Sequence, residues 1–199
     1  LIGLDGKKEI GAWYIEFGKE NRTDWIKIFN DLISRGLKRV LIVVSDDFVG
    51  LSESIESIFP KSDHQLCWVH FIRNLKRNMG KTDYKEFKGG LRKIMVSCDR
   101  FEDAIEEFNK LIEKFKKKYP YFMSKIEKNK EKYFAFKKYP EEVRKYIYTT
   151  NACENINRQI EEKRIRCGGY FQSIEIVDIN FYLIWENLST GRWKNPPPT

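Results

Sequence analysis

One stretch of the chain decides its fold: Val40-Leu41-Ile42-Val43-Val44-Ser45-Asp46-Asp47. Its unbroken aliphatic run is typical of a strand that is buried on both faces, as in a parallel sheet. Open α/β sheets place their ligand sites at the carboxyl ends of their strands, so Asp46 stands where a functional carboxylate is expected. Because Asp and Ser are also common turn formers, the same residues fit a plain strand end.

The sequence around this stretch alternates between helix and strand patterns. Apolar residues at helical spacing predict a helix over 25–33, and a second, shorter helix over 51–59. Residues 64–77 read as a short strand that runs into a helix, and residues 1–17 as two strands around a turn at Asp5-Gly6. The predicted order is ββαβαβα, which favours an α/β fold with a sheet covered by helices.

Beyond residue 70 the strand signal disappears. Residues 100–118 carry apolar side chains at helical spacing, and residues 121–148 are rich in aromatic residues and lysine, so we expect an all-helical insertion over 71–148. This segment holds 22 Lys and Arg residues against 12 Asp and Glu, a net charge of +10, whereas the rest of the chain has a net charge of −2. Such a segment can bind phosphate backbones without reading their sequence. A solvated helical surface is the alternative interpretation.

These patterns divide the chain into three segments. Residues 1–70 form the first part of the core, residues 71–148 the basic helical insertion, and residues 149–199 the helices that complete the core. In the last segment a helix is predicted from Asn151 to Arg166, and Gly168-Gly169 breaks it before another helix over 174–188.

Composition excludes several classes of protein. With 41% hydrophobic residues the chain is globular rather than disordered. No apolar stretch approaches the roughly 20 residues that span a bilayer, and the amino end lacks a signal pattern, so we expect a cytoplasmic protein without a membrane partner. Four scattered cysteines fit free thiols rather than a disulfide framework.

Glu154 is the second candidate for chemistry. It lies in Thr149-Thr150-Asn151-Ala152-Cys153-Glu154, where Asn followed by Glu three residues later is close to a capping box, which explains the spacing by itself. In the functional interpretation, Glu154 projects from the first turn of its helix towards Asp46, and the two carboxylates hold divalent cations through oxygen. The two interpretations can both hold.

Cys67 and His70 have the C-x-x-H spacing of some zinc ligands. A structural zinc site normally needs four ligands, and the chain has only one other histidine, His64, and no paired cysteine motif. The lack of further ligands therefore argues against structural zinc. His70 is interpreted as a residue that packs, or contacts DNA, near the candidate site.

Several motifs, taken in order, resemble one family. Ser45 to Leu51 resembles an S-D-x-x-x-G-L segment, Gln65 to His70 with Arg73-Asn74 resembles a Q-x-C-x-x-H…R-N signature, and Thr149 to Arg158 resembles a T-T-N-x-x-E-x-x-N-R segment. These motifs are similar to those of the IS256/Mutator family of prokaryotic DDE transposases. The resemblance covers most of the chain.

The resemblance implies an RNase H-like fold, with a mixed five-stranded sheet flanked by helices, and the cutting and joining of transposon DNA. Asp46 and Glu154 would be two of three catalytic carboxylates that bind Mg²⁺, for which Mn²⁺ could substitute. The expected partners are DNA and, in the active complex, further copies of the chain on the nucleoid. Asn151, Cys67 and His70 would support the motifs. The residues expected on DNA phosphates are Arg73, Arg158, Lys163, Arg164 and Arg166.

Two departures from the family pattern stand out. Phe48 occupies a position where the family usually has a histidine, and the first catalytic Asp of the family belongs to a strand before Leu1. Asp5 is a poor substitute because it falls in the predicted hairpin turn, so we expect the 199-residue chain to be inactive alone. Two alternatives follow: a DNA-binding remnant of a transposase without catalysis, or an RNase H-like nuclease or resolvase.

Overall fold

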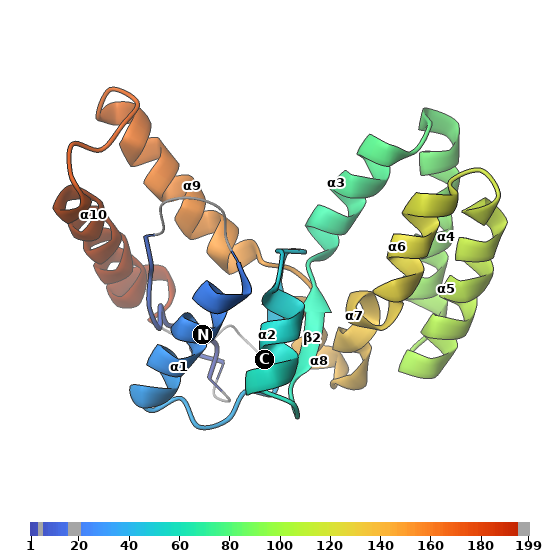
Figure 1. Ribbon diagram of the computed structural model, residues 1–199, viewed down its shortest axis with the longest axis horizontal. Coiled ribbons are helices and arrows are strands. Elements are labelled where there is room, and N and C mark those ends of the chain that lie inside the picture. The colour runs from blue at the N-terminus through green and yellow to red at the C-terminus, as the bar shows by residue number, and fades with distance from the viewer. Residues whose placement is uncertain (4–5, 16–20, 195–199) are drawn as a thin grey trace. The chain divides into compact units, whose positions relative to one another are not determined.

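The computed structural model describes residues 1–3, 6–15 and 21–194 (Figure 1). The chain divides into two compact units. Unit 1 comprises Leu1–Lys19, Ile28–Gly36 and Asn151–Thr199, and unit 2 comprises Glu20–Lys27 and Leu37–Thr150. Helix α1 (Arg22–Ser34), which the sequence predicts over 25–33, contributes residues to both.

A pair of parallel strands forms the sheet of unit 2. Strand β1 (Ile42–Ser45) pairs with β2 (Asp63–Leu66), so that Ile42 lies opposite Asp63 and Ser45 opposite Leu66. Helix α2 (Leu51–Ile58) lies between them in the chain, as predicted. The pairing extends one residue beyond the strands, because the Cys67 amide donates to the Ser45 carbonyl at 2.8 Å. Both predicted strands are therefore confirmed, and their carboxyl ends share one edge.

The amino-terminal segment differs from its prediction. Instead of two strands, residues 1–3 and 6–15 form one isolated antiparallel bridge, between Ile2 and Lys8. Its arms bond to each other, through Gly3 N to Lys7 O and Glu9 N to Leu1 O, both within unit 1. Asp5 lies outside the described residues. The α/β class is confirmed, but the only sheet in the described part of the chain is the two-stranded parallel one, not a mixed five-stranded sheet.

The segment 71–148 is helical, as predicted, and contains no strand at any of its residues, all of which are described. Its amphipathic helices α4, α5 and α6 lie side by side (Figure 1). The prediction of a helical segment is confirmed; the boundaries 1–70, 71–148 and 149–199 stay a prediction. The helices are α3 (Trp68–Asn78), α4 (Lys81–Ser97), α5 (Phe101–Lys116), α6 (Pro120–Lys128), α7 (Lys130–Phe134), the 3-10 helix η1 (Ala135–Lys138) and α8 (Glu141–Ile147).

Aromatic rings fill the core of unit 2. Phe87, Phe108 and Phe134 are fully buried, and Phe71 stacks on Tyr133 with ring centroids 4.0 Å apart. Phe108 meets Phe134 edge to face at 4.9 Å, a preferred geometry for aromatic pairs. Burial of these large apolar surfaces is what packs the helices together.

A buried glutamine joins β2 to these helices. Gln65 has no exposed surface, and its Oε1 accepts the Phe136 amide at 2.8 Å while its Nε2 donates to the carbonyls of Tyr133 (3.1 Å) and Leu66 (2.7 Å). The Trp68 indole donates to the same Tyr133 carbonyl. Because every polar atom of the amide is paired, its burial is not penalised, and the strand is fixed against α7 and η1.

Unit 1 contains the two C-terminal helices. Helix α9 (Asn151–Arg166) ends at Gly168 and Gly169, whose φ values of 84° and 96° favour glycine, as the sequence predicts. Helix α10 (Ile174–Asn187) follows, continues into a π-helical turn (Leu188–Arg192) and lies beside α9 (Figure 1). Trp13 stacks on Phe181 of α10 at 5.5 Å. No helix within the described residues is both long and apolar enough to cross a membrane.

Replacing Gln65 by leucine should destabilise unit 2. The Phe136 amide would stay buried without its acceptor, which costs about 1–3 kcal/mol, whereas the Tyr133 carbonyl keeps its bond from Trp68. Urea unfolding followed by tryptophan fluorescence measures the change. The control is Gln172→Leu at an exposed position, which should stay within about 0.5 kcal/mol of the wild type. Equal unfolding midpoints for the two variants would contradict the role of Gln65.

Candidate active site at the carboxyl edge of the strand pair

Asp46 follows β1 directly, at the edge where both strands end. Because the strands are parallel and Ser45 lies opposite Leu66, the next residues along the two strands, Asp46 and Cys67, emerge at the same edge. Open α/β sheets bind ligands at such an edge. The position predicted for the candidate carboxylate is the one the structure shows.

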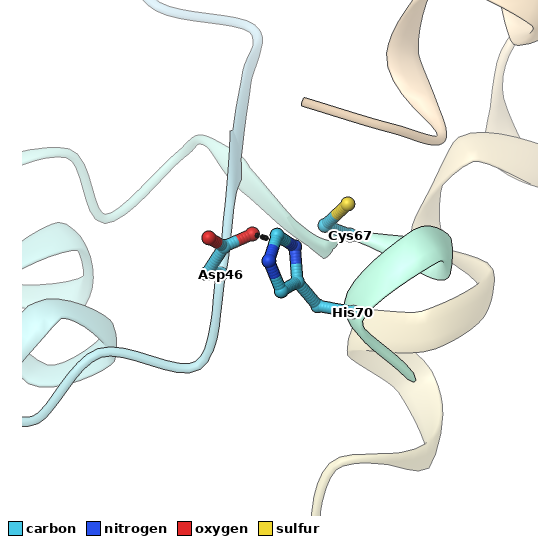
Figure 2. Close-up of side chains that lie close together, drawn as sticks. All are labelled: Asp46, Cys67 and His70. Carbon is cyan, nitrogen blue, oxygen red and sulfur yellow. Dashed lines mark ion pairs between the residues drawn. The ribbon is translucent and has the colours of Figure 1, made fainter. Parts of the chain in front are cut away.

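Three side chains gather around the Asp46 carboxylate, and Figure 2 shows two of them, His70 and Cys67. His70, in the first turn of α3, places Nδ1 2.6 Å from Asp46 Oδ1, and the Thr150 hydroxyl lies 3.4 Å from the same oxygen. The buried Cys67 thiol is 3.2 Å from that hydroxyl and accepts the Thr150 amide at 3.4 Å. Residues far apart in the sequence therefore meet at one carboxylate.

His64, on β2, contacts the last residue of β1, Ser45. Its ring is buried between Ser45 Oγ, 2.8 Å from Nε2, and Ser52 Oγ, 3.2 Å from Nδ1. Burial lowers the pKa of His64 from 6.5 to about 4, and the nearby Lys132 ammonium adds to the effect. A neutral imidazole therefore holds the last residue of β1 at physiological pH.

Asp47, the other carboxylate of the strand end, is engaged elsewhere. Its Oδ2 lies 2.6 Å from Nζ of Lys125 on α6. The neighbouring carboxylates thus have different partners: Asp46 contacts the His70 imidazole, and Asp47 contacts a lysine of α6.

The donor atoms of Asp46, Cys67 and His70 lie within 4.8 Å of one another and form the only such group of His, Cys, Asp and Glu found among the described residues. Oxygen, sulfur and nitrogen together suit borderline transition metals rather than Mg²⁺, which takes oxygen ligands. Of these three residues, only Asp46 fits a magnesium site. A magnesium site at Asp46 would therefore need further oxygen ligands.

Glu154 occupies the first turn of α9, which begins at Asn151, as the sequence predicts. Glu154 belongs to unit 1 and Asp46 to unit 2. The metal site shared by Asp46 and Glu154 therefore stays a prediction. The capping box at Asn151 also stays a prediction.

The cations expected on DNA differ in their present contacts. On α9, Arg158 pairs with Glu162 at 3.2 Å, and Arg164 pairs with Glu161 and donates to the Gly169 carbonyl. Within the part of the chain that the structure describes, Lys163 and Arg166 make no ion pair. Arg73, on α3, contacts His70.

Sequence reasoning missed three features of this site. The clamp of two serines around His64 has no spacing signal, and neither the contact of Thr150 with Cys67 nor that of His70 with Asp46 was anticipated. One signal was available for the last. The C-x-x-H spacing puts Cys67 at the strand edge and His70 one helical turn further, on the same side.

The fold and the site define an α/β protein with a carboxylate, Asp46, that contacts His70 and Thr150 at the carboxyl edge of a parallel strand pair. Residues 1–194 match the family model described as Transposase, Mutator family. The chain therefore belongs to the Mutator family of transposases.

Curated relatives agree with this assignment. The chain is 34% identical over 198 residues to a probable transposase for insertion sequence element ISRM3-like of Sinorhizobium fredii and to the transposase for ISRM3 of Rhizobium meliloti. Each match covers 97% of this chain and 48% of the relative. The transposase for IST2 of Acidithiobacillus ferrooxidans is 26% identical, with coverage of 97% and 65%. The chain thus spans about half the length of the first two relatives.

The buried His64 should make stability depend on pH. Its pKa is about 4 in the folded chain and 6.5 when exposed, so stability is fully present above pH 6.5 and is lost as the pH falls towards 4. At about 1.36 kcal/mol per pKa unit, the loss approaches 3 kcal/mol. Comparing urea unfolding of the wild type and His64→Gln across this range isolates the contribution. Parallel stability curves for the two proteins would contradict it.

Proposed function

We propose that this chain is the catalytic domain of a DNA transposase that cleaves the ends of an insertion sequence and joins them to target DNA. One observation carries the proposal: in a member of a transposase family, Asp46 stands at the carboxyl edge of parallel strands with its carboxylate held by His70 and Thr150. A carboxylate oriented in this way suits an ion ligand better than a turn residue.

In this proposal Asp46 and Glu154 hold divalent cations, Mg²⁺ by preference and Mn²⁺ as a substitute. The ions would activate a water or a 3′-hydroxyl and stabilise the leaving oxygen of an in-line phosphoryl transfer. An RNase H-like arrangement of the two units would bring the carboxylates within the roughly 10 Å that a pair of ions and their ligands can bridge. Asp46 supplies one ligand from the end of β1 and Glu154 another from α9.

The DNA partner would be held through its phosphates. The basic excess of residues 71–148 and the cations of α9 are the groups that a polyanion would meet. Two ends of an element must be processed together, so we also propose that several copies of the chain act in one complex on the chromosome.

Asp46→Asn and Glu154→Gln should each abolish cleavage and strand transfer. Each variant keeps the shape of the side chain but loses the charge that binds the ion, which removes several kcal/mol of transition-state stabilisation, or roughly a thousandfold in rate. The assay uses the product of the complete reading frame, labelled element-end DNA and Mg²⁺ or Mn²⁺.

The control for this experiment is Asp47→Asn. It removes a neighbouring carboxylate that pairs with Lys125, so activity should stay near the wild-type level. Wild-type turnover by Asp46→Asn would overturn the assignment of the site. Cleavage without joined products would instead show a nuclease.

Neutralising Lys163 and Arg166 should weaken DNA binding and its salt dependence. Each phosphate contact that is lost reduces the magnitude of the negative slope of log K against log salt by roughly 1. Lys163→Ala/Arg166→Ala should therefore reduce this magnitude by up to about 2. The matched control is Lys110→Gln/Lys116→Gln, because two glutamates already surround each of these lysines. Fluorescence anisotropy at several salt concentrations measures both slopes, and equal slopes would refute a role for Lys163 and Arg166.

A further inference from the structure

We infer that His70 is a positioning residue for Asp46: Arg73 donates to its Nε2, which leaves the ring proton on Nδ1 next to the carboxylate that it orients. The catalytic consequence of this inference rests on the proposed function. The contact and the tautomer do not, because they follow from the geometry of unit 2 alone.

The backbone that carries His70 is fixed against the strand edge. Helix α3 starts one residue after the Cys67 amide bonds the Ser45 carbonyl, and the Trp68 amide donates to the Tyr148 carbonyl at 3.1 Å. Trp68 itself is buried among Phe71, Phe134 and Phe136. The backbone of the first turn of α3 is therefore anchored at Cys67 and Trp68, just before His70.

Arg73 decides which ring nitrogen carries the proton. Its Nη1 lies 3.2 Å from His70 Nε2, and a guanidinium has only donors, so Nε2 must accept. The ring proton then resides on Nδ1, which lies 2.6 Å from Asp46 Oδ1. The chain of contacts runs in one direction, from Arg73 through His70 to Asp46.

This arrangement assigns His70 to orientation rather than to metal binding. The guanidinium of Arg73 bonds Nε2, and the carboxylate of Asp46 lies 2.6 Å from Nδ1. Partners that hydrogen-bond a ligating carboxylate fix its orientation, and their loss typically costs about 10–100-fold in metal affinity or activity. Asp46 is the residue through which such a loss would act.

Nitrogen-15 NMR of the ¹⁵N-histidine-labelled chain at mildly alkaline pH tests the tautomer. The chain has only two histidines, so the His64→Gln spectrum identifies the signals of His70. We expect a protonated Nδ1 and an unprotonated Nε2 in the wild type, and a shift towards the Nε2–H form in Arg73→Ala. A wild-type His70 that carries its proton on Nε2 would overturn the inference, whatever the protein does to DNA.

Two isosteres test the orienting role. The amide nitrogen of Asn can take the place of His Nδ1, whereas that of Gln reaches the place of Nε2, so His70→Asn keeps the donor to Asp46 and His70→Gln does not. In the cleavage assay, the Mg²⁺ concentration for half-maximal rate should rise about 10–100-fold in His70→Gln and His70→Ala and far less in His70→Asn.

Equal losses in His70→Asn and His70→Ala, with both folded by circular dichroism, would show that the donor does not matter and would overturn the positioning role. A wild-type protein that cuts no DNA would count against the proposed function instead. In that case Mn²⁺ binding, followed by water relaxation, replaces the rate: weaker binding by His70→Ala than by His70→Asn supports the inference, and equal binding overturns it.

Discussion

The full hydrogen bonding of the buried Gln65 amide is the constraint on which unit 2 depends. Neighbouring residues of β2 point to opposite sides: His64 meets Ser45 and Ser52, and Gln65 meets the backbone of α7 and η1. The strand thereby joins the short sheet to the aromatic helical core. It also fixes where α3 begins, and the start of α3 places the imidazole that reaches Asp46. A shift of β2 by one residue would exchange the two sides and dismantle the site.

At the strand edge the neutral polar groups are buried, whereas the charged carboxylates are partly exposed. Buried positions hold neutral donors and acceptors, namely Ser45, Gln65 and a histidine, His64, whose pKa burial lowers to about 4. The carboxylates appear only where side chains are partly exposed, and each has a basic or hydrogen-bonding partner. Burying an unpaired charge would cost far more than these neutral contacts, so the arrangement lets Asp46 remain an anion at the rim without destabilising the core.

The elements of this fold could be predicted from the sequence much better than their contacts. The run 40–44, the stripe of 25–33 and the helical pattern beyond residue 70 report local burial, and the structure confirms them. The periodicity of a sequence does not show which elements contact one another. Residues 1–17 read as two strands, but among those described the only strand pairing is the bridge between Ile2 and Lys8. The C-x-x-H spacing places His70 one turn beyond the strand edge, but its contact with Asp46 also depends on the parallel register of β1 and β2, which local spacing does not give.

The basic charge of residues 71–148 is less uniform in the structure than in the sequence. Lysines of α5, α6 and α7 are largely paired with carboxylates, and Lys114 and Lys118 also take up the two acidic residues of α4, Glu86 and Asp83. The cations of α3 and α4 that are exposed, and that pair with no carboxylate within the described residues, are Lys76, Arg77, Lys81, Lys85, Lys88, Arg92 and Lys93. The excess charge is therefore concentrated on two adjoining helices, and the first of these starts at the Asp46 site. A polyanion attracted by charge alone would meet α3 and α4 first. The net charge of the segment does not reveal this, because it does not say which helices carry the unpaired cations.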